Sequence, residues 1–313
     1  MYLLKGYDDA VQEILDTGVN RTNKRTGIKT LSKFGVLTRY RLDTEYFPIV
    51  TRRRVWPQSV FAELLWFISG STNNEDLKKL GCNFWTPWVN DEFEKKHGYA
   101  PGCFGPVYGF QLRHFGGHYG NGIGGEAHTL DRSVKIECNS GGAVWEEDDG
   151  SIYGSGGFDQ LSWVINRIKE DHSCRRTLWT LWNPKDVEGM RLPPCHLLYQ
   201  VLVDDDRKLT GIMYQRSCDT IIGIPANIQF YSALTIMIAQ QTECQASEFV
   251  HVMADAHLYE DQLEGVRQYL ATPVIDSPKL SIHKASDILS YSLDDFVLTD
   301  FSPGPKINIP VAV

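Results

Sequence analysis

The chain has 313 residues, of which 42% are hydrophobic and 22% charged, and its formal net charge is -8 at pH 7. This composition is that of an ordinary globular protein with a sizeable core, and the acidic balance argues against a general DNA-binding protein, because phosphate backbones favour net positive charge. The first residues lack the basic and long apolar regions of a signal peptide, and no apolar run is long enough for a membrane span. We therefore expect a cytoplasmic protein that binds neither DNA nor membranes.

The elements of the first half of the chain are a strand, a helix and a long glycine-rich segment. β-Branched and aromatic residues predict the strand at 30–42, and a largely apolar run predicts the helix at 58–69. Glu63 lies inside that helix, where a carboxylate must face water, find a partner or have a raised pKa. Residues 113–159 are rich in glycine and predict a loop-like insertion. A phosphate-binding glycine loop is the weaker interpretation, because no Lys-Ser or Lys-Thr pair follows.

The second half of the chain alternates less regularly than a doubly wound fold requires. We expect helices at 156–171 and 228–240, with a turn at 225–227 opening the second, and strands at 177–182, 196–203 and 209–215 joined in part by a hairpin turn at 204–208. Helices and strands mixed in this way favour the α+β class over a doubly wound α/β fold. We expect one domain over residues 1–313, with the insertion at about 113–159.

Seven cysteines are an odd number, and none belongs to a CxxC pair or a similar zinc-binding motif. We therefore expect no metal site and a reducing compartment, and each cysteine taken alone is best interpreted as a small buried hydrophobic residue. Cys195 differs, because Pro193 and Pro194 hold it rigidly just before a strand. Across the predicted hairpin, Arg216 is expected on the neighbouring strand, where its charge would favour the thiolate. Spacing alone still favours a structural cysteine.

Longer motifs decide the interpretation of Cys195. Residues 192–259 resemble the thymidylate synthase family through Pro194-Cys195-His196, YQRSCD at 214–219, GIPANI at 223–228 and DAHLY at 255–259. The resemblance continues upstream and downstream in RTG at 25–27, FPIVT at 47–51, ELLWF at 63–67, Trp85, GPVYG at 105–109, Arg175-Arg176 and PVAV at 310–313. Nearly the whole chain is covered, except for the glycine-rich insertion.

The resemblance implies both a fold and a reaction. The fold is a single domain in which helices pack on a large mixed or antiparallel sheet, and two copies form a homodimer sheet to sheet. The reaction is methylation of dUMP to dTMP with 5,10-methylenetetrahydrofolate, through a Cys195 thiolate adduct at C6 of the pyrimidine. Glu63 is similar to the family carboxylate that relays protons to O4, and Tyr108 to the residue that orders water. His196 is close enough in sequence to help, although a histidine on a strand is more often structural.

The resemblance also implies how the nucleotide is bound. Forked guanidinium donors suit a phosphate dianion, and the family match gives this role to Arg25, Arg216 and Ser217. Arg175 and Arg176 resemble a pair donated across the dimer interface, although such a pair is otherwise most often a solvated edge. The remaining matches are His257 and Tyr259 for the sugar 3'-hydroxyl and Asn227 for the base. An asparagine amide can donate to O4 and accept from N3–H of uracil, whereas cytosine-specific relatives carry aspartate at this position.

The folate side matches the family less closely than the nucleotide side. Asp219 resembles the contact to the pterin, although an aspartate often caps a turn. The other residues matched to the folate are Trp85, Phe84, Ile222, Ala226, Leu192 and Val313. Ala226 stands where the family usually has phenylalanine, and we expect the larger Phe84 to compensate for its volume. Trp56 and Gln262 stand at positions where histidine is frequent.

Two other functions are compatible with parts of the sequence. One is a dUMP hydroxymethylase of the same fold, in which water captures the methylene intermediate, and the change at Ala226 is the argument for it. Trp85, Leu192 and Val313 resemble residues that keep water out of the methylating site, and they favour methylation. The other function is a non-catalytic RNA-binding or regulatory role, against which the acidic charge and the full set of polar site residues argue.

Overall fold

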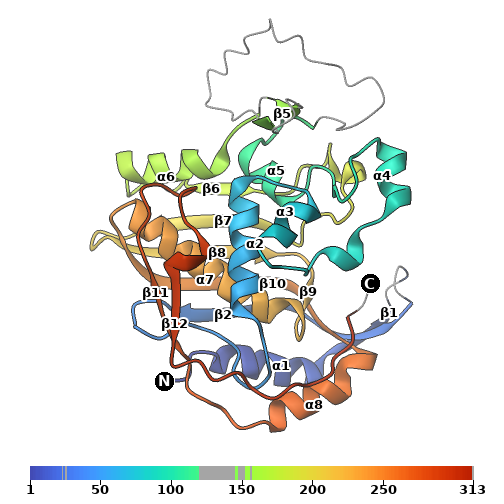
Figure 1. Ribbon diagram of the computed structural model, residues 1–313. Helices are drawn as coiled ribbons and strands as arrows, with labels where there is room; N and C mark the ends of the chain where they lie inside the picture. Colours follow the sequence, from blue (N-terminus) through green and yellow to red (C-terminus); the bar gives the residue numbers. More distant parts are fainter. Residues whose placement is uncertain (23, 25–26, 120–144, 147–151, 156, 312–313) are drawn as a thin grey trace, which may run out of the picture.

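The computed structural model describes residues 1–22, 24, 27–119, 145–146, 152–155 and 157–311 (Figure 1). Its centre is a seven-stranded sheet with the order β1-β2-β10-β8-β7-β6, and β9 pairs with β10 beside this path. The strands are β1 (Val19–Thr22), β2 (Lys29–Arg41), β6 (Leu178–Thr180), β7 (His196–Val203), β8 (Lys208–Gln215), β9 (Cys218–Asp219) and β10 (Gln245–Tyr259). β10 runs antiparallel to β2 and parallel to β8 and β9, which confirms the prediction of a large mixed sheet in an α+β protein.

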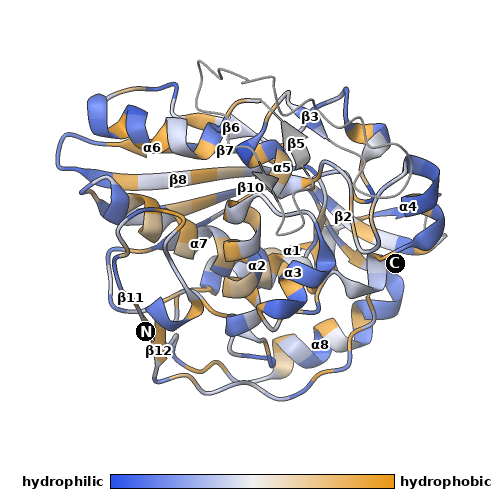
Figure 2. Cartoon of the chain, turned by 45° about the horizontal axis from the view of Figure 1, so that its top comes forward, coloured by the Kyte–Doolittle hydropathy of each residue, from blue (hydrophilic) through white to orange (hydrophobic). Residues whose placement is uncertain are grey.

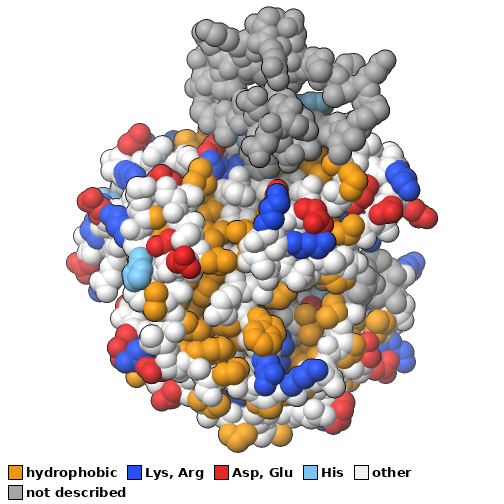
Figure 3. All heavy atoms as spheres, viewed as in Figure 1, with side chains coloured by type: hydrophobic (Ala, Val, Ile, Leu, Met, Phe, Trp, Pro, Cys, Tyr) orange, Lys and Arg blue, Asp and Glu red, His pale blue; other side chains and the backbone are white. Residues whose placement is uncertain are grey.

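Helices α2 and α7 lie across one face of this sheet (Figure 1). The helices are α1 (Lys5–Thr17), α2 (Pro57–Ser69), α3 (Asn74–Lys79), α4 (Asp91–His97), α5 (Tyr108–Arg113), α6 (Gln160–Glu170), α7 (Gly223–Gln241) and α8 (Leu263–Ala271). α4 is hydrophilic, whereas α7 carries many hydrophobic residues (Figure 2). Hydrophobic side chains also gather on the surface across the middle of the face that carries α2 (Figure 3). None of the helices in the described part of the chain is both long and apolar enough to cross a membrane.

The predicted elements agree with the structure in type and differ at their ends. α2 and β7 match their predicted ranges almost residue for residue, and the turn at 204–208 is present, closed by the Asp204 N–H donating to the Lys208 carbonyl at 3.0 Å. α7 begins at Gly223, five residues earlier than predicted, because proline is tolerated in the first turn of a helix, where its missing N–H has no partner to lose. α6 begins only at residue 160, because the Asp159 carboxylate accepts from the Ser162 N–H at 3.0 Å and caps it there.

A row of apolar side chains crosses the sheet on the face away from these helices. Leu37 of β2, Val252 of β10 and Tyr214 of β8 are paired directly, so they point to the same face. Leu37 is 52% exposed and Tyr214 40% exposed, whereas Met213 and Met253, the next residues along β8 and β10, are fully buried. Along this row the helices therefore cover only one face of the sheet in the described part of the chain.

The ends of the glycine-rich segment meet at a buried ion pair. Arg113 at the end of α5 and Asp159 before α6 approach to 2.7 Å, and both side chains are buried. Phe115 and Phe158 pair next to them as an antiparallel bridge. The prediction of a loop-like segment is wrong where the segment forms three short strands. These are β3 (His118–Tyr119), β4 (Trp145–Glu146) and β5 (Ile152–Ser155), and they pair in the order β3-β5-β4. Of the predicted insertion at 113–159, residues 120–144, 147–151 and 156 lie outside the described residues.

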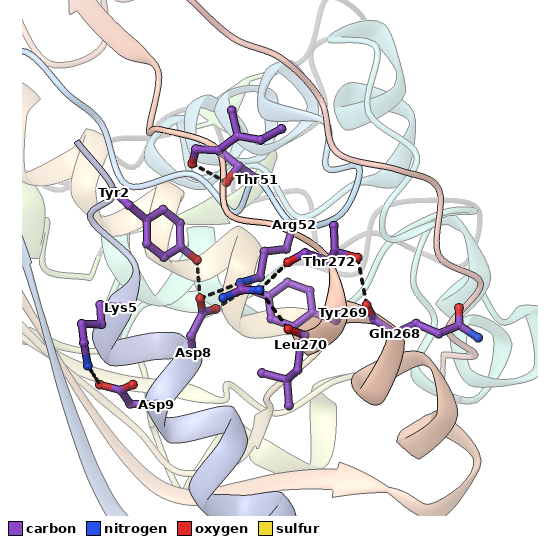
Figure 4. Close-up of polar contacts among 11 residues, drawn as sticks. Tyr2, Lys5, Asp8, Asp9, Thr51, Arg52, Gln268, Tyr269, Leu270 and Thr272 are labelled. Carbon is purple, nitrogen blue, oxygen red and sulfur yellow. Dashed lines mark hydrogen bonds and ion pairs between the residues drawn. The ribbon is translucent and has the colours of Figure 1, made fainter.

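A polar cluster ties the segment before α2 to the two helices at the base of the molecule (Figure 4). The Asp8 carboxylate of α1 accepts from the hydroxyls of Tyr2 at 2.6 Å and Tyr269 at 2.5 Å, and from Arg52 Nε at 2.8 Å. Arg52 also donates to the Leu270 carbonyl in α8 at 2.9 Å. Because the ion pair is largely buried and every Asp8 oxygen has a donor, the cluster fixes residue 52 relative to α1 and α8.

The C-terminal segment lies against the same stretch of chain. It follows a small antiparallel sheet of β11 (Lys279–Ile282) and β12 (Phe296–Thr299). The Arg54 N–H donates to the Pro305 carbonyl at 2.9 Å. Gly304 leaves no room for a side chain, because a Cβ there would lie 2.3 Å from the Thr51 carbonyl oxygen. Residues 304–305 therefore lie against the segment that precedes α2.

Candidate active site

Cys195 lies immediately before β7, beside the end of β8. The Arg216 N–H donates to the Cys195 carbonyl at 2.9 Å, and Arg216 Nη2 lies 4.0 Å from Cys195 Sγ. Arg216 Nε and Nη2 also donate to the carbonyls of Pro194 and Pro193 at 2.8 and 2.9 Å. The guanidinium is therefore held in place, with the Trp182 ring beneath it at 5.2 Å. The predicted pairing of Cys195 and Arg216 is confirmed, and the fixed positive charge favours the thiolate.

Tyr108 fixes the backbone of the nucleophile. Its hydroxyl accepts from the Cys195 N–H at 2.7 Å. The ring packs against Phe67 at 4.6 Å, Trp85 at 5.6 Å and His196 at 5.3 Å between ring centroids. Burial raises the pKa of Tyr108 well above its ordinary value, so its hydroxyl keeps its proton and can donate that hydrogen to a second acceptor.

Glu63 of α2 is partly buried and accepts from the Trp85 indole N–H at 2.5 Å. Burial raises the pKa of its carboxyl to about 7, against an ordinary value of 4.5, and the indole donor opposes this shift only in part. A carboxyl with a pKa near neutrality exchanges protons readily in both directions. Of the three possibilities that the sequence leaves open for Glu63, the structure shows a partner and a raised pKa, while its role as a proton relay stays a prediction.

We expect Glu63→Gln to change the pH dependence of stability. The folded wild type binds the Glu63 proton more tightly than the unfolded chain, so its free energy of unfolding falls as pH rises from about 4.5 to about 7. Glutamine has no such titration. The stability of the variant relative to wild type should therefore rise across this interval, by at most about 3 kcal/mol, and stay constant above it. Urea unfolding at pH 4.5, 6 and 8 measures the difference, and a pH-independent difference would contradict the raised pKa.

His196 and Asn227 lie together next to the nucleophile. Burial lowers the pKa of His196 to about 4, so the ring is neutral near pH 7, and a side-chain hydrogen bond links it to Asn227. Asn227 Nδ2 also donates to Gln215 Oε1 at 3.1 Å. The amide keeps one N–H and part of its carbonyl acceptor capacity, as recognition of uracil requires. A neutral His196 does not supply a positive charge to the site.

A polar pocket lies at the junction of β1, β2 and β10. It is lined by Arg21, Thr22, Lys24, Thr30, Ser217, Asp255, His257 and Tyr259. The pocket brings together three residues that the family motifs indicate, namely Ser217, His257 and Tyr259. His257 Nδ1 lies 3.1 Å from the Asp255 carbonyl, and its ring meets that of Tyr259 edge-on at 5.1 Å.

Sequence reasoning missed two cations and a carboxylate of this pocket. Arg21 and Lys24 line it, and Arg21 forms an ion pair of 2.5 Å with Asp255. The signal was the density of basic residues before the first long strand, from which only Arg25 was chosen. Arg25 itself lies outside the described residues, and so does Val313.

Arg175 and Arg176 are exposed and precede the edge strand β6. Their backbones are anchored, since the Arg175 carbonyl accepts from Gln200 Nε2 at 3.0 Å and the Arg176 carbonyl from the Leu178 N–H at 2.9 Å. The two guanidinium groups thus project from the rim of the sheet. Their predicted role in a second subunit's site stays a prediction.

Asp219 lies under the start of α7 and is linked to the end of the chain. Its Oδ1 accepts from the Ile222 N–H at 3.0 Å and its Oδ2 from Gln262 Nε2 at 3.0 Å, while burial raises the pKa of the carboxyl. Gln262 Nε2 also donates to the Pro310 carbonyl at 3.1 Å. The glutamine that stands in place of the usual histidine therefore bridges the predicted pterin contact and the C-terminal segment.

The other residues predicted to contact folate are mostly apolar and half-buried. Trp85 is buried in an aromatic group with Trp66 at 5.4 Å and Phe104 at 5.1 Å. Trp56 is 59% exposed at the N-terminal end of α2. The remaining four pack against the core at its edge and are Phe84, Leu192, Ile222 and Ala226. The proposed exchange of volume between positions 84 and 226 stays a prediction.

In this site a cysteine lies against a guanidinium, and Tyr108 and Glu63 can donate or exchange protons nearby. This arrangement is typical of an enzyme that works through a covalent adduct. Among the described residues no group of histidine, cysteine and carboxylate side chains could hold a metal ion. The family model described as thymidylate synthase matches residues 5–313. The chain belongs to the thymidylate synthase family and is an enzyme of the methyltransferase type.

Individual relatives agree with this assignment. A thymidylate synthase of Human herpesvirus 8 type P is 39% identical, over 97% of this chain and 82% of the relative. A thymidylate synthase of Herpesvirus ateles is 38% identical, over 98% of this chain and 97% of the relative. A bifunctional dihydrofolate reductase-thymidylate synthase of Zea mays is 38% identical over 98% of this chain. The match covers 54% of that longer protein.

Proposed function

We propose that this chain methylates dUMP to dTMP, with 5,10-methylenetetrahydrofolate as cosubstrate. The observation that carries the proposal is the placement of Cys195 Sγ 4.0 Å from Arg216 Nη2, with its backbone held by Tyr108. Family membership across residues 5–313 supports the reaction type. The Cys195 thiolate adds to C6 of the uracil ring, and the electron pair of the C5–C6 double bond moves toward C5 and O4, which makes C5 nucleophilic.

The surrounding residues then handle charge and protons. Glu63, with its pKa near 7, exchanges a proton with O4 through water as negative charge develops there and is discharged. Tyr108, which keeps its proton, orders the water that removes the C5 proton. Methylenetetrahydrofolate, when bound, supplies the one-carbon unit and the hydride. The Cys195–C6 bond then breaks, the C5–C6 double bond re-forms, and the thiolate is released with dTMP.

The polar pocket suits the nucleotide's phosphate and sugar. Arg21 and Lys24 bring positive charge to its lining, and Ser217 adds a hydroxyl donor. With the predicted Arg25 and Arg216, they would hold the phosphate dianion. His257 and Tyr259 line the same pocket, which supports the proposal that they contact the sugar hydroxyl.

The folate side fits a pterin and a folded C-terminus. Asp219 is a partly buried carboxyl whose oxygens are directed by Ile222 and Gln262, which supports its proposed contact with a pterin N–H. Half-buried apolar side chains at 84, 192, 222 and 226 provide surface for an aromatic ring system. Through Gln262 and Pro310, the same carboxyl is tied to the segment that precedes Val313.

The hydroxymethylase alternative is not favoured, because the relatives are named thymidylate synthases. The two reactions differ in the folate product. Hydride transfer to the methylene carbon leaves dihydrofolate, whereas capture by water leaves tetrahydrofolate. We expect dihydrofolate to form in proportion to the dUMP consumed, which its absorbance measures. Tetrahydrofolate as the product would contradict the proposal.

We also propose a homodimer packed sheet to sheet. The row formed by Leu37, Val252 and Tyr214 continues to Leu198 of β7, so four apolar side chains cross the sheet on the face away from α2 and α7. Two of them are at least 40% exposed. A second copy placed on this face would bury the row in a self-complementary contact. In such a dimer, we propose that the exposed Arg175 and Arg176 reach the partner's phosphate pocket, as the family resemblance implies.

Mixing two inactive variants tests whether sites are shared. Arg176→Ala removes the donated guanidinium and Cys195→Ser removes the nucleophile. If each site uses Cys195 of one chain and Arg176 of the other, a heterodimer has one intact site and one doubly altered site. We expect co-refolded mixtures to recover about a quarter of wild-type activity, because half of the dimers are mixed. Absence of recovery in isolated heterodimers would contradict the sharing of sites.

Two further features complete the proposal. The buried Arg113–Asp159 pair supports an insertion at 113–159 that leaves from and returns to one point of a single catalytic domain.

A site that depends on the thiol of Cys195 suits a reducing compartment, which supports a cytoplasmic location.

A further inference from the structure

A buried histidine on β10 reaches the base-recognition amide through one intermediary. His251 is fully buried, and its Nε2 lies 2.9 Å from Gln215 Oε1. The same oxygen accepts from Asn227 Nδ2 at 3.1 Å. On its other side, Gln215 Nε2 donates to the Ser217 carbonyl at 3.0 Å. Gln215 thus stands between His251 and Asn227 and is itself buried.

The chemistry of these four groups fixes the direction of every hydrogen bond. The Ser217 backbone oxygen only accepts, so the amide nitrogen of Gln215 must face it. Gln215 Oε1 therefore faces the other two partners, and both must donate to it. His251 must then carry its proton on Nε2, and its Nδ1 is a buried atom without a hydrogen-bond partner in the described structure.

Burial keeps this arrangement constant with pH. It lowers the pKa of His251 to about 3, and the nearby His196 acts in the same direction. The ring is thus neutral throughout the physiological range and has one N–H, which is directed at Gln215. A neutral histidine in a buried site behaves here as a fixed donor.

We propose that His251 is a positioning residue that fixes the amide orientation of Asn227 through Gln215 and thereby sets the preference for uracil over cytosine. This inference rests on the proposed function. If the Asn227 amide were reversed, its oxygen would face Gln215 Oε1, and two acceptors would lie in contact. Gln215 cannot reverse to relieve this contact, because Ser217 holds its nitrogen and the His251 N–H holds its oxygen.

The orientation matters because the two bases present opposite patterns. Uracil offers an acceptor at O4 and a donor at N3–H, which match the free N–H and the carbonyl of Asn227 as held. Cytosine offers a donor at its exocyclic amine and an acceptor at N3, and it requires the reversed amide. Removing the His251 donor loosens Gln215, so the reversed pair becomes accessible and discrimination against dCMP weakens.

A matched pair of substitutions tests the role. His251→Gln keeps an N–H donor at about the position of Nε2, and His251→Met has similar length and volume without a donor. The readout is the ratio of the dissociation constants for dCMP and dUMP, measured by calorimetry. We expect the methionine variant to lower this ratio about tenfold, the worth of one buried hydrogen bond, and the glutamine variant to keep it within about threefold of wild type.

If His251 has a merely structural role, both variants should bind dUMP and dCMP more weakly by the same factor. The ratio of the two dissociation constants would then stay unchanged, and this result would overturn the inference. If wild type itself fails to prefer dUMP and forms no dTMP, the proposed function is wrong, a result distinct from an unchanged ratio. One measurement needs no variant. In protein with 15N-labelled histidine, the dUMP complex should show the His251 proton on Nε2, and a proton on Nδ1 would contradict the relay.

Discussion

Replacing Cys195 with serine is expected to lower the rate of dTMP formation by at least about 10⁴-fold. A serine hydroxyl is far less acidic than a thiol, and a guanidinium at 4.0 Å does not ionise it near neutral pH. Addition at C6 is then lost, whereas the groups that bind the phosphate, sugar and base remain. Affinity for dUMP should therefore stay within about tenfold of wild type by calorimetry.

Cys244→Ser is the matched control for this experiment. Cys244 is also half-buried and lies after α7. Its thiol contacts the Thr242 carbonyl at 3.5 Å, and its N–H donates to the Ala239 carbonyl at 2.8 Å. We expect it to keep full activity. A serine variant at 195 with substantial turnover would show that the nucleophile is misassigned.

Replacing Asn227 with aspartate is expected to invert the preference between dUMP and dCMP. The carboxylate has no N–H for O4 of uracil, and it accepts from the exocyclic amine of cytosine. It also turns an acceptor toward Gln215 Oε1, which now accepts from Asn227 Nδ2 at 3.1 Å. O4 of uracil is then left without its hydrogen-bond donor, and a site discriminates strongly against a substrate whose polar group it leaves unpaired. We therefore expect kcat/KM for dUMP to fall about 10³-fold relative to that for dCMP.

Asn227→Ala separates loss of the amide from gain of the charge. It should weaken the binding of dUMP and reduce the preference for dUMP over dCMP without reversing it. The alanine side chain offers neither the donor that suits uracil nor the acceptors that suit cytosine. The rates with both nucleotides, measured on the same preparations, give the ratio. If the aspartate variant still prefers dUMP, base choice does not depend on position 227.

The sequence predicted the part of the site that depends on neighbouring strands. A hairpin turn at 204–208 makes β7 and β8 antiparallel, and this alone brings Arg216 back to Cys195. The helical position of Glu63 also followed from the apolar run around it. Its partner did not, because Trp85 reaches Glu63 from a short connection after α3 that has no periodic pattern.

Contacts across the parallel strand pair were beyond sequence reasoning for a similar reason. His251 meets Gln215 only because α7 carries the chain across the sheet and returns it as β10, parallel to β8. His251 lies outside the family motifs, and the YQRSCD motif that contains Gln215 does not indicate which groups its amide contacts. Gln262 departs from the family pattern in the sequence, but only the structure shows that it bridges Asp219 and Pro310.

We propose that a Cys195 adduct of dUMP receives the methyl group. Mass spectrometry of the nucleotide formed from dUMP and methylenetetrahydrofolate tests it most directly, with Cys195→Ser as the blank. We predict dTMP from the wild type and unchanged dUMP from the variant. A product of 5-hydroxymethyl-dUMP, or dTMP formed equally by both proteins, would contradict the account.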